Sequence, residues 1–154
     1  MKKEKTLILV KPDGVQRGLI GNIINRFEDK GLKMIGLKMI TLNDVLLEAH
    51  YSHLTDKPFF GEIKNFMKSS PIVAMAWEGG EGTVSAVRIL VGPTKGQKAP
   101  AGTIRGDYGL SGSNNIVHAS DSVDNGEIEV ERFFKKEELF EYEKTQDLHI
   151  YGKK

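Results

Sequence analysis

The stretch TLILVKPDG, residues 6–14, decides how the fold of this 154-residue chain is interpreted. Its first five residues favour β structure and hardly alternate between apolar and polar, which is typical of a buried strand. Pro12, Asp13 and Gly14 then supply turn chemistry that ends the strand. Lys11 lies between the two parts, and a charge at the end of a buried strand requires a reason.

Three further strands, with helices between them, extend this pattern along the chain. The strands are predicted at residues 32–41, 72–77 and 115–119. The clearest helix has four apolar residues on one face and ends at a glycine: Ile20, Ile23, Ile24, Phe27 and Gly31. Four strands with interspersed helices predict a single α+β domain over residues 1–154, with one sheet and its helices over one face.

The other helices are predicted from caps and short apolar stripes. Asn43 or Thr41 caps a short helix, and Pro58 marks the start of the next one. Residues 120–122 offer N-cap chemistry for a helix that runs to about Phe134. A charged helical turn is expected near residues 136–142, close to the end of the chain.

Residues 92–114 lose the periodic pattern that marks the rest of the chain. Nine of the 17 glycines lie between Gly79 and Gly112, so much of the chain's glycine is concentrated in and before this segment. A connection of this length in a compact domain is usually either a functional loop or a disordered one.

Composition excludes several classes of protein. The chain has 22 Lys and Arg against 21 Asp and Glu, which argues against a nucleic-acid coat or a membrane-surface binder. It has no cysteine, hence no disulfide framework and no thiolate metal site. The apolar run at residues 6–10 is too short for a signal peptide or a membrane span, so a cytoplasmic location is the default expectation.

His118 is the first candidate for chemistry, within the stretch NIVHASDS at residues 115–122. It lies on a predicted strand just before a helix start, where an anion would bind favourably. An imidazole suits nucleophilic or acid–base work near neutral pH, and Glu129 could orient one of its nitrogens. The alternative is a partly buried structural histidine, and the local pattern alone favours that alternative.

Cations and aromatic residues form two weaker candidate groups. Arg88, Arg105 and Lys11, with the Thr94 hydroxyl, could bind phosphate, although each cation alone could equally be a solvated surface charge. Around Phe59, Phe60 and Tyr51 a nucleobase could stack, whereas ordinary core packing explains at least one of the two Phe residues equally well. Neither a phosphate-binding glycine loop of the common types nor a metal cage is present in the sequence.

Five blocks of sequence together resemble the nucleoside diphosphate kinases, over nearly the whole chain from Thr6 to Tyr151. They are KPDGVQRG at residues 11–18, HY at 50–51, KPFF at 57–60, GTIRGD at 102–107 and NIVHASDS at 115–122. The resemblance implies a ferredoxin-like sandwich with a four-stranded antiparallel sheet. It also implies a ping-pong reaction, in which His118 takes the γ-phosphate of a nucleoside triphosphate and passes it to a nucleoside diphosphate.

The resemblance also implies roles for individual residues. The catalytic group would be His118, Lys11, Tyr51, Glu129 and Ser120. The nucleotide-binding group would be Lys11, Phe59, Arg88, Thr94, Arg105 and Asn115, with Phe59 on the base and Lys11 and Asn115 at the ribose. Mg²⁺ would be the cofactor, held by phosphates and water with no direct protein ligand and with Asp121 as an outer partner. A homohexamer is expected, with a tetramer as the alternative; neither a membrane nor a nucleic acid is expected as a partner.

Departures from the family pattern lie in the long loop and at the base slot. Ala101 intervenes between Pro100 and the GTIR block, which leaves the loop conformation open. Gly112 stands where many members have an apolar residue opposite Phe59, so either this wall is open or Leu110 fills it. His53 is not assigned a role. The rival interpretation is a ferredoxin-like module that binds nucleotides or single-stranded nucleic acid without turnover.

Overall fold

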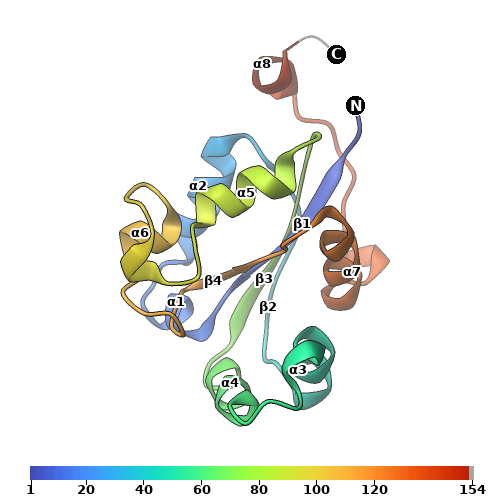
Figure 1. Cartoon of the computed structure of the whole chain (residues 1–154). Helices are drawn as coiled ribbons and strands as arrows, with labels where there is room; N and C mark the ends of the chain where they lie inside the picture. Colours follow the sequence, from blue (N-terminus) through green and yellow to red (C-terminus); the bar gives the residue numbers. More distant parts are fainter. Residues whose placement is uncertain (153–154) are drawn as a thin grey trace.

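The computed structural model describes residues 1–152, and one antiparallel sheet runs through its middle (Figure 1). The strands are β1 (Glu4–Val10), β2 (Lys33–Ile40), β3 (Ile72–Gly79) and β4 (Val117–Ala119), in the order β2-β3-β1-β4. The helices are α1 (Pro12–Gln16), α2 (Ile20–Lys30), α3 (Asp44–His50), α4 (Phe60–Met67), α5 (Thr83–Val91), α6 (Ile104–Tyr108), α7 (Val123–Phe133) and α8 (Asp147–Tyr151). The predicted four-stranded antiparallel sheet of an α+β fold is confirmed.

Helices cover both faces of the sheet, so the prediction of helices over one face is wrong. On one face Ile8 and Trp77 pack with Phe27 of α2 and Val87 of α5. On the other face apolar residues of β1 and β3 pack with Leu47 of α3, Met67 of α4 and Phe133 of α7. Figure 1 shows α2 and α5 on one side of the sheet and α7 on the other. Both faces of β1 and β3 are therefore buried, and for this reason their sequences do not alternate between apolar and polar residues.

Local capping signals are accurate guides to several helix ends. Asn43, rather than Thr41, caps α3 by accepting a hydrogen bond from the Leu46 amide at 2.8 Å. Ser122 caps α7 in the same way, through the Asn125 amide. Gly31 ends α2 in the left-handed region with φ 101°, which glycine adopts without steric cost.

Three segments differ from their prediction. The expected turn at residues 11–14 is instead the start of helix α1. Pro12 fits the first turn of this helix, because the amide hydrogen that proline lacks would have no partner there. The long loop contains α6, and its preceding turn around Ala101 is closed by the Thr103 hydroxyl, which donates to the Pro100 carbonyl at 2.7 Å. The C-terminal region has only a 3₁₀ turn at Lys136–Glu138, followed by α8, which was not predicted.

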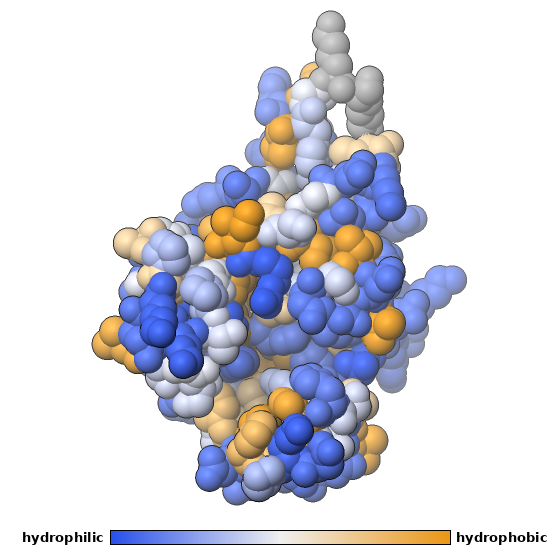
Figure 2. Space-filling view, in the orientation of Figure 1, coloured by the Kyte–Doolittle hydropathy of each residue, from blue (hydrophilic) through white to orange (hydrophobic). Residues whose placement is uncertain are grey.

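None of the helices within residues 1–152 is long and apolar enough to cross a lipid bilayer. The space-filling view shows a hollow between the lobe formed by α3 and α4 and the body of the molecule (Figure 2).

Candidate active site

Two adjoining cavities bring the predicted site residues together from distant parts of the chain. The first has a volume of about 630 Å³ and the second about 580 Å³, and Lys11, Tyr51, Thr94 and Asn115 line both. The first is also lined by Arg88, Arg105, His118, Asp121 and Glu129. Phe59 lines the second. Ser120 is fully buried behind the first cavity.

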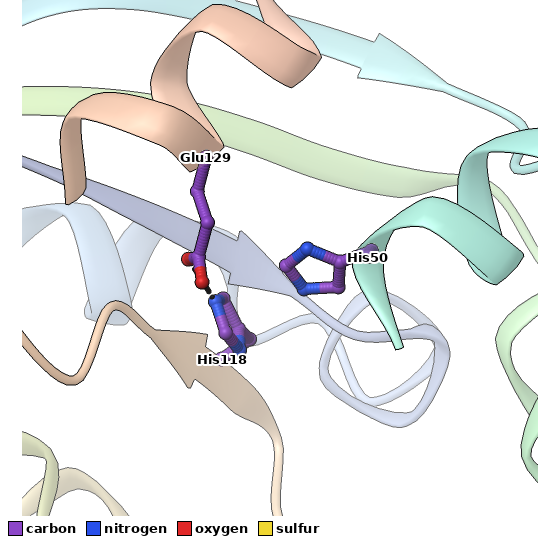
Figure 3. Close-up of side chains that lie close together, drawn as sticks. All are labelled: His50, His118 and Glu129. Atoms are coloured by element: carbon purple, nitrogen blue, oxygen red, sulfur yellow. Dashed lines mark hydrogen bonds and ion pairs between the residues drawn. The ribbon is translucent and has the colours of Figure 1, made fainter. Parts of the chain in front are cut away.

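His118 is held through one ring nitrogen, which is directed at Glu129 (Figure 3). Its Nε2 lies 2.6 Å from Oε1 of Glu129 on α7, and the same oxygen accepts a hydrogen bond from the Ser120 hydroxyl at 2.9 Å. Ser120 in turn accepts from the Leu7 amide at 3.0 Å, so its own proton is directed to Glu129. Because the ionised carboxylate is only an acceptor, Nε2 carries the ring proton and Nδ1 keeps a free lone pair.

The His118 ring is largely buried, with 19% of its side chain exposed. Burial lowers its pKa; Glu129 opposes this effect, whereas Lys11 and Arg105 add to it. A lowered pKa leaves the imidazole neutral at neutral pH, which a nucleophile requires. The register places His118 opposite Leu9 of the buried strand β1, so the backbone beneath the ring is part of the sheet.

A strained residue precedes this strand. Ile116 has a φ of 76°, which is a genuine outlier for a β-branched side chain. Its amide donates to Oδ2 of Asp13 at 3.0 Å, and its carbonyl accepts from the Lys11 amide at 2.8 Å. The conformation therefore joins the end of β1 to the start of β4, and sets His118 and Lys11 at one edge of the cavity.

Cations line the first cavity beside His118, and they outnumber the carboxylates there. The buried Arg105 donates to the carbonyls of Gly92, Asn115 and Val117 at 2.6–3.1 Å. Burial and the neighbouring Arg88 lower its pKa to about 10. Lys11 donates to Oδ1 of Asn115 at 2.8 Å, and burial together with Arg105 lowers its pKa to about 8. Such a set of cations favours a bound polyanion.

Comparison with known proteins identifies the family. The model of the family described as nucleoside diphosphate kinase matches residues 4–139. The chain belongs to the nucleoside diphosphate kinase family. It is 52% identical to the nucleoside diphosphate kinase of Parabacteroides distasonis, with 97% of each chain covered, and 50% identical to that of Carboxydothermus hydrogenoformans, with 96% and 99% covered.

Solved structures agree with this membership. The structure of a halophilic nucleoside diphosphate kinase from Halobacterium salinarum in complex with CDP matches with a TM-score of 0.92 at 44% identity, over 97% of this chain and 99% of that one. A nucleoside diphosphate kinase family protein from Babesia bovis matches with the same TM-score and identity, over 96% and 99%. The chain is therefore a nucleotide-binding phosphotransferase with the ferredoxin-like fold of this family.

The walls of the second cavity decide between the alternatives expected for Phe59, Phe60 and Leu110. Phe59 lines this cavity and is 46% exposed, so its ring is accessible for stacking. The adjacent Phe60 is 6% exposed, so core packing explains this residue. Gly112 also lines this cavity. Leu110 is 86% exposed and does not line the second cavity, so the expectation that Leu110 fills the wall at Gly112 is wrong.

Two residues for which no role was predicted also line the first cavity of this kinase, His50 and Arg132. His50 lies in the HY block at residues 50–51, in which the resemblance implies a role for Tyr51 alone. Arg132 follows Glu129 by three residues on α7, and residues at this spacing share a helix face, so that spacing could have found it. His53, which has no predicted role, also lines the cavity.

Proposed function

We propose that this chain transfers the γ-phosphate of a nucleoside triphosphate to a nucleoside diphosphate in a ping-pong reaction, with Nδ1 of His118 as the nucleophile. One observation carries the assignment: Glu129, held by Ser120, binds Nε2, which leaves the lone pair of Nδ1 free among phosphate-binding cations. Covalent catalysis divides a transfer between two anionic nucleotides into two separate steps.

In the first step Nδ1 of His118 forms a bond to the γ-phosphorus, and the bond from that phosphorus to the β–γ bridging oxygen breaks. The diphosphate leaves with both electrons of that bond. The ring gains positive charge as the new bond forms, and the hydrogen bond from Nε2 to Glu129 stabilises that charge. In the second step a terminal phosphate oxygen of another diphosphate attacks the phosphohistidine, and the ring returns to its neutral form.

The cations bind the phosphates and the polar residues bind the sugar. Arg88, Arg105 and the Thr94 hydroxyl serve the phosphates, and Lys11 serves the transferred phosphate. Asn115 and Lys11 also face the ribose, and their mutual hydrogen bond at 2.8 Å sets both side chains in place. Burial raises the pKa of Tyr51 to about 12, so its hydroxyl stays protonated and supports the histidine region as a donor.

The second cavity, which we assign as the base slot, supports broad nucleotide tolerance. The exposed ring of Phe59 would stack on any base, because every base has a π face. Gly112 adds no side chain to the wall that it lines, so this part of the cavity does not exclude a purine by size. The Halobacterium salinarum relative was solved with CDP, and a pyrimidine diphosphate is accordingly expected to bind here as well.

Kinases that act on nucleotides generally use a divalent cation, and Mg²⁺ fits this site only as a partner of the phosphates. A nitrogen of His50, a nitrogen of His118 and an oxygen of Glu129 lie within 4.8 Å of one another, but Mg²⁺ prefers oxygen ligands. Asp121 is an exposed carboxylate at the cavity, and the amide of Asn125 keeps its pKa below the ordinary value. We therefore assign Asp121 as the residue that would hold the ion through water, where the ion would neutralise phosphate charge.

Initial rates with ATP and GDP test the reaction. We expect GTP and ADP to form, and double-reciprocal plots at several GDP concentrations to be parallel, because the two substrates never occupy the enzyme together. Intersecting lines would exclude the phosphoenzyme route. No turnover, with salt-sensitive binding of long single-stranded nucleic acid, would support the passive binding module instead.

The lowered pKa of Lys11 leads to a prediction for alkaline pH. Lys11 is charged below its pKa of about 8 and neutral above it, so kcat/KM is expected to fall as pH rises through that value. In Lys11→Arg the guanidinium stays charged, and the alkaline limb should move to higher pH even if the overall rate is lower. Identical alkaline limbs in the two proteins would show that Lys11 is not the titrating group.

The exposed apolar side chains of the edge strand β2 support assembly with further copies of the chain, for which a hexamer is the proposed form. Leu37 and Met39 point outward there without cover from residues 1–152. An exposed apolar edge of this kind favours burial against another copy. Light scattering coupled to gel filtration distinguishes a hexamer from a tetramer.

A further inference from the structure

His50 is a buried polar residue that the reaction as described above does not use. It is the last residue of α3, and 8% of it is exposed. Three aromatic rings surround it edge to face: Tyr51, His118 and Phe133, at centroid distances of 4.9, 4.5 and 5.1 Å. A polar ring in such a position requires a partner for each nitrogen, or a reason for lacking one.

Arg132 decides which nitrogen of His50 carries the proton. Its Nη1 lies 3.1 Å from Nδ1 of His50. A guanidinium is only a donor, so Nδ1 must accept, and the neutral ring then has its proton on Nε2. Burial lowers the pKa of His50 to about 2, and the neighbouring His118 and Arg132 act in the same direction, so the ring stays neutral at any working pH.

The Nε2–H group of His50 has no hydrogen-bond acceptor among residues 1–152. The two imidazoles make an angle of 76°, and Figure 3 shows the edge of His50 directed at the ring of His118. The positive edge of one ring against the π face of another is attractive, and an N–H group at that edge strengthens the contact. The same tautomer disfavours a metal ion on this histidine pair, because Nε2 can bind a metal only after losing its proton.

We propose that His50, held by Arg132, is a positioning residue that fixes the ring plane of His118, so that Nε2 meets Glu129 while Nδ1 faces the nucleotide. This inference rests on the proposed nucleophilic role of His118. Glu129 alone fixes one atom of the ring and leaves rotation about that hydrogen bond open. A contact on the ring face closes this rotation, and orientation of a nucleophile contributes strongly to rate.

The positive edge of His50 has a second effect, on the charge of His118. It disfavours the imidazolium form, since a cationic ring would be repelled by the N–H group. Lys11, which follows β1, and Arg105 on α6 act in the same direction, and Glu129 on α7 opposes them. Removing the Nε2–H group should therefore let His118 hold its proton to higher pH.

His50→Phe tests the proposal, because phenylalanine keeps the aromatic packing but has neither the acceptor nor the N–H group. We expect the first-order rate of phosphorylation by ATP to fall ~10- to 100-fold with the KM for ATP unchanged. The acid limb of kcat/KM should shift to higher pH. His50→Gln retains an acceptor for Arg132 and an N–H donor toward His118, and should recover most of the rate. His149→Phe, on the distant helix α8, is the matched control.

Two results would overturn the proposal. One is a wild-type phosphorylation rate and an unshifted acid limb in His50→Phe. The other is a raised KM with an unchanged rate, which would make His50 a nucleotide-binding residue. In these assays His118 is intact and still accepts label. A failure of the His50 proposal can therefore be distinguished from a failure of the proposed function, which the His118 variant tests.

A measurement on the unaltered protein remains decisive if His50→Phe does not fold. Nitrogen-15 NMR of the imidazoles should show His50 as the neutral tautomer protonated at Nε2. In Arg132→Met the donor is lost while the His50 ring remains, and the Nδ1–H tautomer should become populated. If His50 is protonated at Nδ1 in the unaltered protein, the proposal is wrong.

Discussion

Replacing His118 with alanine is expected to abolish both phosphorylation of the protein and turnover. In the unaltered protein, mixing with γ-labelled ATP and Mg²⁺ should place ³²P on the chain in an acid-labile, base-stable form, as expected for phosphohistidine. Loss of the nucleophile should lower kcat by a factor on the order of 10⁴ or more, because the remaining groups can bind phosphates but cannot carry one.

The control for His118→Ala is a histidine outside the cavities. His149 is exposed on α8, and His149→Ala should accept label and turn over like the unaltered protein. Circular dichroism and the thermal midpoint establish that His118→Ala is folded. If the folded variant still accepts label and still transfers phosphate, His118 is not the carrier and the proposed mechanism is wrong.

Replacing Gly126 with alanine is expected to cause a large loss of stability, through contact between two main-chain segments. Gly126 is buried in α7 where this helix crosses β1, and an added Cβ would lie well inside van der Waals distance of the Lys5 carbonyl oxygen. Neither side can escape by changing a rotamer, so helix and strand must separate. We expect the free energy of unfolding to fall by about 3 kcal/mol or more.

Gly21→Ala is the matched control for this substitution. Gly21 also lies in a helix, α2, but a Cβ there meets nothing within 4 Å. Alanine at such a site should stabilise the protein by about 0.5–1 kcal/mol, because glycine loses more conformational freedom on folding. Urea midpoints at one fixed protein concentration measure both variants. Equal midpoints for Gly126→Ala and the unaltered protein would contradict the packing of α7 on β1.

The Gly126 variant also connects the fold to the site. Glu129 follows it by three residues on the same helix, so any shift of α7 from β1 also moves Glu129 relative to His118. We expect Gly126→Ala to lose phosphorylation rate at temperatures where it is still folded, whereas Gly21→Ala should keep it.

Much of the architecture could be predicted from local features of the sequence. Unbroken apolar runs mark β1 and β3, because strands buried on both sides need no polar face. Asn43 and Ser122 mark helix starts, because their side chains accept hydrogen bonds from backbone amides three residues further on. Gly31 marks a helix end, because it adopts the left-handed conformation there. The short helix α8 lacked such a signal: its cap residue, Gln146, makes no side-chain hydrogen bond to the helix.

By itself, the sequence determined the four strands, most of the longer helices, the candidate His118 and, by resemblance, the family. Only the tertiary structure decided that helices cover both faces of the sheet and that Phe59 rather than Phe60 lines the second cavity. It also decided that Arg132 sets the tautomer of His50. The physical reason is range. Periodicity and capping act within a few residues of the chain, whereas His50 and Arg132 are 82 positions apart and meet only when α3 and α7 pack on the same side of the sheet.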